Sequence, residues 1–507
     1  MASQQLEVER KFDVDPSFAV PDLAGVAGVA TVDGPVEHAL EAVYFDTADL
    51  RLARARITLR RRTGGADAGW HLKLPADAGA RVELHSPLGR AGKRPPAAVT
   101  APVTGVLRGA PAAPVATLRT RRLVTFLRDG EGRTLAEVAD DTVTATVPAA
   151  DPGAPAEVRS WREVEVELGS GSDVLLTAVG ERLLTAGARP SSSASKLRRA
   201  LAGRLPAPPG EKGRPSAGDV VLDAVRAQVD ALQAADVMVR TDRPDAVHGL
   251  RVAARRLRSI TAAARPVLDR RTTDPLRAEL RWLGAELSEV RDEEVALARL
   301  REVVAAEPAE LVLGPVAARL QQNALRLAGS GHERAVATIS SARYLALLDQ
   351  LHALLEAPAL TGEASRPAGP VLRRFLRRAG RRVRRRLQEV AQVDAGGRPA
   401  ALHGLRKAAK RARYTGEMTV PVLGRPAKDL VEICTRVQDV LGEQQDSVVA
   451  RAHCRQLGLA AAAAGENAWT YGRLHGLEQA RAERAEAAFG DLAPSLARAL
   501  RRAGRKH

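Results

Sequence analysis

The spacing of hydrophobic and polar residues changes near residue 210 of the 507-residue chain. Before that point, short apolar runs that often alternate with polar residues are separated by Gly, Pro and Asp, a pattern typical of antiparallel strands. Strands are predicted over 41–45, 57–62, 70–74, 81–84, 118–127, 134–139, 143–147 and 161–168, and a helix over 173–186. Many short strands at this spacing favour a barrel or a sandwich.

After residue 218 the apolar positions recur with the 3.6-residue period of helices, and breaks are predicted near 240–244, 266, 308, 329–331, 361–370, 396–399 and 421–426. Residues 203–218 are rich in Pro and Gly and are predicted to be a linker. We therefore expect an α+β protein with two domains, a strand-rich domain over 1–202 and an all-α domain over 219–507.

Composition narrows the classes of function. Lys and Arg outnumber Asp and Glu by 77 to 60, a net charge of +17, which points to an anionic partner such as nucleic acid, a membrane surface or polyphosphate. Aromatic residues are only 3% of the chain and no nucleic-acid-binding motif is evident, which argues against nucleic acid. The sequence shows no signal peptide and no apolar run of about 18 residues, so a cytoplasmic protein without a membrane span is expected. The two cysteines, Cys434 and Cys454, argue against a disulfide framework.

The strand half carries rows of charge. In an extended segment Glu7, Glu9 and Lys11 share one face, and taken alone they are explained most simply as a solvated edge strand. Further segments repeat the pattern, with charged positions at Arg60, Arg62, Lys73, Glu83, Arg119, Arg121, Glu163, Glu165 and Glu167. If these faces line the inside of a closed sheet, opposite charges compensate, and a metal with a phosphate chain completes the balance. The alternative is an ordinary barrel with its charges outside.

The helical half contains an internal repeat. The segment His248-Gly249-Leu250-Arg251 recurs as His403-Gly404-Leu405-Arg406, and an aspartate follows at a similar distance in each copy, Asp292 and Asp446. We therefore predict a duplicated helical bundle, over about 219–356 and 370–507. In each copy one helical stripe is basic: His248, Arg251, Arg255 and Arg258, then His403, Arg406, Lys410 and Arg413. Such stripes suit an extended anion, and arginine's fork matches phosphate oxygens. A solvated basic face paired with acids is the alternative. The arginine-rich segment 372–386, which includes Arg377 and Arg381, adds a third basic surface.

Taken together, these motifs resemble two known families. The first 200 or so residues are similar to the CYTH family of triphosphate tunnel metalloenzymes through Glu7-x-Glu9-x-Lys11, Tyr44-Phe45-Asp46-Thr47, Leu59-Arg60-x-Arg62, Leu72-Lys73-Leu74-Pro75, Arg119-x-Arg121, Glu163-x-Glu165-x-Glu167 and Ser195-Lys196. The helical half resembles the CHAD domain, the conserved-histidine α-helical domain, through both His-x-x-Arg helices, Arg291-Asp292 and Leu441-Gly442 with Asp446.

The resemblance implies an eight-stranded antiparallel tunnel that acts on triphosphates with Mg²⁺ or Mn²⁺, joined to a helical domain that binds inorganic polyphosphate. It assigns metal binding to Glu7, Glu9, Glu83, Glu163, Glu165 and Glu167. It assigns phosphate binding to Lys11, Arg60, Arg62, Lys73, Arg119, Arg121 and Lys196, with Glu7, Glu9 and Lys11 as catalytic residues. The polyphosphate surface comprises His248, Arg251, Arg255, Arg258, His403, Arg406, Lys410 and Arg413, with Arg377 and Arg381.

The sequence departs from the family pattern at His85, where many members carry an acid, and this puts the number of metals and the activity in question. The leading interpretation is an inorganic triphosphatase whose helical domain binds polyphosphate. A non-catalytic polyphosphate-binding protein is the alternative, and adenylate cyclase or nucleoside or thiamine triphosphatase activity is a weaker one. Association with polyphosphate granules is compatible with either of the first two, and the sequence gives no indication of oligomeric state.

Overall fold

The computed structural model describes residues 3–26, 28–65, 67–76, 80–89, 94–149, 153–205, 213–287, 289–394 and 396–503. The chain divides into two compact units, residues 1–210 and 211–507. Part of the expected linker, residues 206–212, lies outside the described residues. Among the described helices, none combines the length and the apolar stretch that crossing a bilayer requires.

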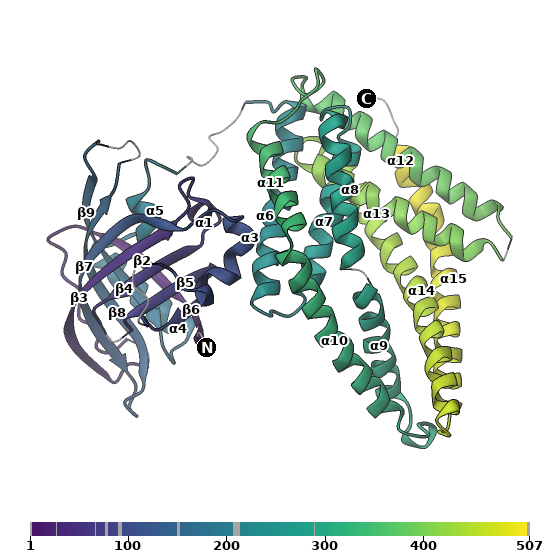
Figure 1. Ribbon diagram of the computed structural model, residues 1–507, viewed down its shortest axis with the longest axis horizontal. Helices are drawn as coiled ribbons and strands as arrows, with labels where there is room; N and C mark the ends of the chain where they lie inside the picture. Colours follow the sequence, from purple (N-terminus) through teal and green to yellow (C-terminus); the bar gives the residue numbers. More distant parts are fainter. Residues whose placement is uncertain are drawn as a thin grey trace. The chain divides into compact units, whose positions relative to one another are not determined.

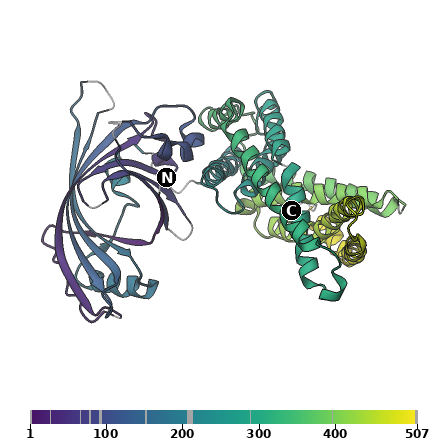
Figure 2. The same cartoon turned by 60° about the horizontal axis from the view of Figure 1, so that its bottom comes forward.

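The first unit is built on one antiparallel sheet that closes on itself (Figure 2). Its strands are β1 (Ser3–Glu7), β2 (Glu9–Val14), β3 (Thr31–Asp46), β4 (Thr58–Thr63), β5 (Gly69–Pro75), β6 (Arg81–Ser86), β7 (Ala113–Arg128), β8 (Thr134–Val147), β9 (Glu157–Leu168) and the two-residue β10 (Arg189–Pro190), in the order β1-β6-β5-β4-β3-β7-β8-β9-β2-β10. β1 and β2 are separated only by Val8, and one pairs with β6 while the other pairs with β9. If β1 and β2 are counted as one strand and β10 is set aside, the described sheet has the eight strands of the predicted tunnel, and that fold is confirmed.

The charged faces of the strands point inward because their apolar faces are covered from outside. Val164 and Val166 of β9 are fully buried against Val179 and Leu183 of α4 (Asp173–Thr185). On another part of the sheet, the short helix α5 (Lys196–Ala200) buries Leu197 in a cluster with residues of β3, β7 and β8. Burying these apolar faces under helices leaves the alternate, charged positions for the interior.

One strand prediction was wrong. The segments 134–139 and 143–147 are not two strands but one, β8, which runs through Asp140 and Asp141. Aspartate is depleted in strands, so the pair indicated a break. Here each carboxylate has a partner on a neighbouring strand: Asp140 accepts from Arg162 of β9 at 2.7 and 2.9 Å, and Asp141 accepts from Arg122 of β7 at 2.6 and 2.8 Å.

The second unit is all-helical, as predicted (Figure 1). Its helices are α6 (Ala217–Arg240), α7 (Ala246–Ala263), α8 (Arg270–Glu286), α9 (Glu289–Ala306), α10 (Val316–Ser340), α11 (Ala342–Glu356), α12 (Ala368–Gln392), α13 (Arg398–Leu423), α14 (Arg425–Ala463) and α15 (Trp469–Ala503), with a described 3₁₀ turn, Ala309–Leu311, between α9 and α10. One apolar core lies mainly among α6, α7, α8, α11 and the start of α12, and a second among α12, α13, α14 and α15.

The two histidine segments lie on α7 and α13. The predicted break at 329–331 is absent, since α10 continues to Ser340. Glycine within a helix costs about 1 kcal/mol relative to alanine, and the packing of Ala335 and Ile339 into the first core outweighs it. Both cysteines are free and buried within α14.

Candidate functional site

The closed sheet of the first unit surrounds a cavity of about 410 Å³ whose described wall carries as many acids as bases. Its acidic lining residues are Glu7, Glu9, Asp67, Glu83, Glu137, Glu165 and Glu167, and its basic ones are Lys11, Arg60, Arg62, Lys73, Arg81, Arg122 and Lys196. Most residues that the sequence assigned to the site are therefore brought together. Glu163 is buried next to this set, in contact with Lys196.

At one end of the cavity, Lys73 connects two acids. Its ammonium donates to both oxygens of Glu7 at 2.8 and 2.6 Å and lies 3.8 Å from Glu83. Glu83 also lies 2.6 Å from Nδ1 of the buried His71. Burial, reinforced by Glu83, raises the pKa of Glu7 to about 8 against the opposing charge of Lys73. Burial alone would raise the pKa of Glu83, but its bonds with His71 and Glu7 and the charges of Lys73 and Arg60 hold that pKa well below its ordinary value. The protonation of Glu7 therefore depends on Glu83 and on the position of the Lys73 ammonium.

Lys11 links the acidic strands β2 and β9. Its ammonium donates to Glu9 at 2.9 Å and also to Glu165. Burial opposes its charge, yet Glu165 and Glu9 raise its pKa above the ordinary lysine value. The same charge lowers the pKa of Glu9 although burial acts the other way. Lys11 is therefore held as a cation inside the cavity.

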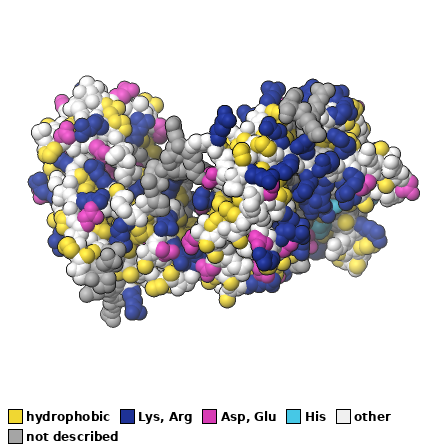
Figure 3. All heavy atoms as spheres, turned by 90° about the horizontal axis from the view of Figure 1, so that it is seen from above, with side chains coloured by type: hydrophobic (Ala, Val, Ile, Leu, Met, Phe, Trp, Pro, Cys, Tyr) yellow, Lys and Arg dark blue, Asp and Glu magenta, His cyan; other side chains and the backbone are white. Residues whose placement is uncertain are grey.

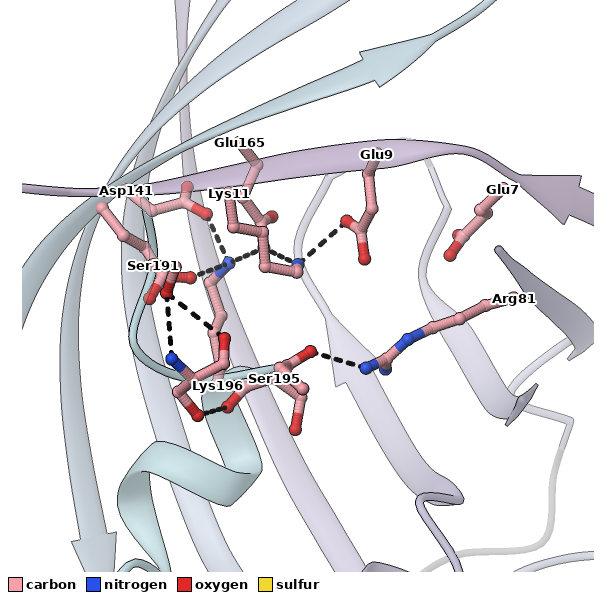
Figure 4. A network of polar contacts seen from close by, with 12 residues as sticks. Glu7, Glu9, Lys11, Arg81, Asp141, Glu165, Ser191, Ser195 and Lys196 are labelled. Carbon is pink, nitrogen blue, oxygen red and sulfur yellow. Dashed lines mark hydrogen bonds and ion pairs between the residues drawn. The ribbon is translucent and has the colours of Figure 1, made fainter. Parts of the chain in front are cut away.

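Lys196, at the start of α5, closes a buried acidic cluster formed by Asp141, Glu163 and Glu165 (Figure 4). Its ammonium lies 2.9, 2.7 and 2.6 Å from these three carboxylates. Burial lowers the pKa of Lys196, but the three acids raise it well above its ordinary value. One carboxylate oxygen from each of the three acids lies within 4.8 Å of the other two. Such hard oxygen donors suit a divalent cation, but Lys196 would have to move for one to enter.

A second acidic row lies on the same face, although among the described residues only the set of Asp141, Glu163 and Glu165 brings three ligand oxygens within 4.8 Å of one another. Glu9, Glu167 and Glu137 stand directly opposite one another on β2, β9 and β8. Burial and the neighbouring charges of Glu9, Glu137 and Glu165 raise the pKa of Glu167 despite an opposing effect of Lys73. Three carboxylates that repel one another, on adjacent strands of a cavity, match the oxygen-ligand preference of Mg²⁺ and Mn²⁺. Glu137 was missed by the sequence analysis, although its alternation with Ala139 and Asp141 along β8 could have revealed it.

Arg119 and Arg121 were assigned wrongly. Their side chains are 76% and 61% exposed on the outer face of β7, where they pair with Glu41 and Glu37. The arginine that enters the cavity is Arg122, which donates to both oxygens of Asp141 and, at 2.8 Å, to Glu165. Side chains alternate between the two faces of a strand. Arg121 was selected from the sequence instead of its neighbour Arg122, and this shift of one residue assigned the outer face of β7 to the cavity.

His85 occupies a confined position. It follows Glu83 on the inner face of β6, with its ring 4.9 Å from that of His71. His71 is the residue opposite on β5, and Gly69, two residues before it, provides the space, because a Cβ there would lie 2.1 Å from Nε2 of His85. That nitrogen is buried and has no hydrogen-bond partner among the described residues. The imidazole therefore packs against His71 and leaves Glu83 as the acid of this strand in the cavity wall.

In the helical unit the two basic stripes converge. Lys410 of α13 lies near Arg255 and Arg251 of α7, and burial together with these and other arginines lowers its pKa to about 7. Tyr414 helps to hold the like-charged helices together, since Arg255 donates to its hydroxyl at 3.3 Å and Arg256 lies over its ring at 5.2 Å. Figure 3 shows Lys and Arg side chains gathered on one face of this unit.

The cluster is larger than the sequence indicated. Burial and the charges of Arg281 and Arg277, both on α8, lower the pKa of Arg258. Arg411 is similarly affected by burial and by Arg382 of α12. Arg382 and Arg386 of α12 both lower the pKa of Arg411 through their charge. Arg377 is half-buried and Arg381 is exposed, and polyphosphate binding by these two residues stays a prediction.

The two histidines differ in their surroundings. His403 is partly buried beside Lys407 and Arg406, and burial with these charges lowers its pKa. His248 lines a separate hollow of about 410 Å³ together with His332 and Glu286. The side chains of Arg291 and Asp292 lie outside the described residues.

Comparison with known proteins gives a match in each unit. The CYTH domain model matches residues 5–201, and the CHAD domain model matches residues 223–455. An uncharacterized protein of Mycobacterium tuberculosis is 40% identical over 99% of this chain and 98% of its own length. Among solved structures, the CHAD domain of the plant Ricinus communis is 22% identical over 57% of this chain and 94% of its own, with a TM-score of 0.45. A putative adenylate cyclase from Bacillus halodurans is 19% identical over 39% of this chain and 97% of its own, with a TM-score of 0.28.

Proposed function

The chain belongs to the family of proteins that join a CYTH domain to a CHAD domain, and we propose that it is a metal-dependent triphosphatase that also binds inorganic polyphosphate. The closed sheet would hydrolyse inorganic triphosphate, and the basic face of the helical unit would hold longer chains. Phosphoanhydride chemistry is the class of reaction that CYTH domains perform.

The observation that carries this proposal is the charge balance of the cavity. Its described lining holds seven acids and seven bases, so the protein alone supplies no net positive charge for a triphosphate. A highly charged anion enters a closed, low-dielectric space only with compensating cations. The acidic row of Glu9, Glu137 and Glu167 provides oxygen ligands for such a cation, Mg²⁺ or Mn²⁺, beside the basic groups that would hold phosphate.

The roles of the residues follow from their places. Arg60, Arg62 and Arg122 present guanidinium groups toward the cavity and suit phosphate oxygens. Lys11 and Lys73 are ammonium groups held in place by acids that a phosphate can replace as partners. When bound, the metal would neutralise charge that develops on the phosphoryl oxygens. A carboxylate of the acidic row would orient the attacking water and accept its proton.

The test is the release of phosphate from triphosphate by the purified full chain with Mg²⁺ or Mn²⁺. Glu9→Gln and Glu167→Gln should each lower kcat/KM about 100-fold or more, because each removes a charged ligand from the cavity. Glu157→Gln is the matched control. Glu157 is exposed at the start of β9, the strand that carries Glu167, and its substitution should leave the rate unchanged. Full activity in both cavity variants would refute the catalytic proposal.

The helical unit is tested by binding. Long-chain polyphosphate should be retained by the full chain in a salt-sensitive way, because the contacts would be between cationic side chains and phosphates. Reversing charge at two converging positions, Arg255→Glu and Lys410→Glu, should abolish retention, while Arg326→Glu on α10 should not. Equal affinity for nucleic acid would argue against a polyphosphate-specific role.

A protein that binds polyphosphate without hydrolysing it is the second candidate. It is favoured by the ion pairs of Lys73 with Glu7 and of Lys196 with its three acids, which already place a cation beside these carboxylates without a metal. Retention of triphosphate without phosphate release under any divalent metal would select this alternative. Pyrophosphate release from ATP with formation of a cyclic nucleotide would instead select the cyclase.

A further inference from the structure

A second cavity adjoins the first at the end of the tunnel where α5 lies. It has a volume of about 380 Å³ and shares three lining residues with the tunnel cavity: Thr58, Arg81 and Ser195. Its other lining residues come from α1 (Arg51–Arg54), from the turn between α1 and β4, and from the segment before and within α5: Ala53, Arg56, Ile57, Ser192, Ala194, Leu197 and Arg198. The two cavities therefore meet at residues that line both of them.

Arg81 forms this division. It extends from β6 toward the segment that precedes α5 and donates to the carbonyl oxygen of Ala194 at 2.6 Å (Figure 4). It is a single hydrogen bond made by a long, flexible side chain to a partly exposed loop. A phosphate oxygen is a stronger acceptor for a guanidinium than a neutral carbonyl, so an anion at this point can replace Ala194 as its partner.

The second cavity is basic in a way that the tunnel is not. Three arginines line it, Arg56, Arg81 and Arg198, and no described lining residue is acidic. Within the described part of the chain, the guanidinium groups of Arg56 and Arg198 have no carboxylate partner. Where the tunnel neutralises its own charges, this cavity leaves positive charge unbalanced. It fits an anion without the help of a metal.

The backbone at Arg56 supports a role for its side chain. Arg56 has a φ of 61°, in the left-handed region that favours glycine or asparagine, and it lies in the turn between α1 (Arg51–Arg54) and β4. The turn itself would be formed more easily by glycine. An arginine held in this conformation, with its side chain on a cavity wall, indicates that the side chain matters more there than the ease of the turn.

We propose that this cavity, through Arg56, Arg81 and Arg198, binds the phosphoryl groups of a linear polyphosphate that extend beyond the part held in the tunnel. The inference rests on the proposed triphosphatase function and sharpens it: the substrate class is a phosphate chain longer than three units, taken from its end. The cavity lacks described aromatic lining residues, which disfavours a stacked nucleobase as its occupant.

The experiment compares linear tripolyphosphate, linear hexaphosphate and ATP as substrates of the full chain. To remove retention by the helical unit, all proteins carry Arg255→Glu and Lys410→Glu. The test variant adds Arg56→Gln and Arg198→Gln. A matched control adds Arg54→Gln, which removes an exposed arginine at the end of α1 that does not line the cavity. Arg81 is left intact because it also lines the tunnel.

The test variant should raise KM for hexaphosphate about tenfold, the effect of losing charge-assisted hydrogen bonds, and leave kcat and the KM for tripolyphosphate within about twofold. The Arg54→Gln control should change neither KM. An unchanged KM ratio between the two substrates would overturn the inference while leaving triphosphatase activity intact. A KM change confined to ATP would assign the cavity to a nucleoside instead. If the protein in which this cavity is unmodified hydrolyses none of the three substrates, the proposed triphosphatase function itself is refuted.

Discussion

The ammonium group of Lys73 on β5 lies 2.8 and 2.6 Å from the two carboxylate oxygens of Glu7 on β1, across the intervening strand β6. A residue expected to bind phosphate is thus held by a residue expected to bind metal. Phosphate can contact Lys73 fully only if this ion pair loosens, and a metal at the acidic row of Glu9, Glu137 and Glu167 would loosen it if Glu7 joined its ligands. The pair couples the two binding events in the proposed mechanism.

This coupling predicts opposite effects of one substitution. Glu7→Gln removes the carboxylate that holds Lys73, so at a pH above about 8, where Glu7 is ionised, binding of triphosphate in the absence of metal should tighten about tenfold. Metal-dependent hydrolysis should be lost in the same variant. Isothermal titration calorimetry with EDTA measures the first effect, and phosphate release with Mg²⁺ measures the second. Glu41→Gln, which removes an outer-face acid paired with Arg119, should show neither effect. Weaker metal-free binding by Glu7→Gln would contradict the coupling.

Arg121 and Arg122 are neighbours on β7, and comparing them tests which face of this strand lines the cavity. Arg122→Lys keeps the charge but loses the forked contact with Asp141, so the KM for triphosphate should rise about tenfold. The free energy of unfolding should also fall by about 1–3 kcal/mol, because Asp141 is fully buried and would be left partly unsatisfied. Arg121→Lys, one position away and exposed, should change neither quantity. Steady-state kinetics and urea unfolding supply the two measurements, and equal effects of the two variants would show that the face assignment is incorrect.

The sequence was sufficient for the class of fold and for most of the cavity, because strand alternation is a local property. A row such as Glu7, Glu9 and Lys11 shows its shared face without any knowledge of neighbouring strands. The sequence was insufficient where basic residues occur on both faces of one strand, as at Arg119, Arg121 and Arg122. Only the pairing of β7 with β3 and β8 decides which of these residues face inward.

Contacts between distant segments were the other limit. Glu137 and Glu167 each alternate within their own strand, but their position opposite Glu9 depends on the register of three strands. The crowding of Lys410 by Arg255 likewise depends on how α7 packs against α13. A helical wheel shows each stripe but not which stripes meet. The second cavity beside α5 has no signal in the sequence, since its residues come from three separate segments.

The acidic row predicts which residues set the metal requirement. Glu137→Gln should raise the Mg²⁺ concentration needed for half-maximal activity about tenfold, because it removes one charged ligand and part of the repulsion that favours a cation. Removal of metal with EDTA should abolish hydrolysis in both the natural chain and this variant. Glu131→Gln, in the β7–β8 turn, is the matched control and should titrate like the natural chain. An unshifted metal titration for Glu137→Gln would locate the cation elsewhere, and the cluster around Lys196 would become the leading site.

Lys410 is expected to make polyphosphate binding depend on pH. Burial, with the charges of Arg255 and Arg406 among others, lowers the pKa of this lysine to about 7 in the free protein, whereas a bound polyanion favours its charged form. Binding therefore takes up a proton, and the affinity should fall about tenfold between pH 6 and pH 8. The end groups of the polyphosphate gain negative charge over this range, which acts in the opposite direction.

Lys410→Arg provides the decisive comparison, because arginine stays charged across this range. Its affinity for polyphosphate should match that of the natural chain at pH 6 and should hardly change up to pH 8. The pKa of His403 is lowered by burial and by Lys407 and Arg406, so His403→Gln should leave the pH dependence in place. The lowered pKa of Lys410 also means that the unfolded chain binds more protons than the folded one between pH 7 and about 10, so the free energy of unfolding should rise with pH over that range. Lys410→Met should flatten that rise, and a pH dependence of binding that persists in Lys410→Arg would place the titrating group elsewhere on the basic face.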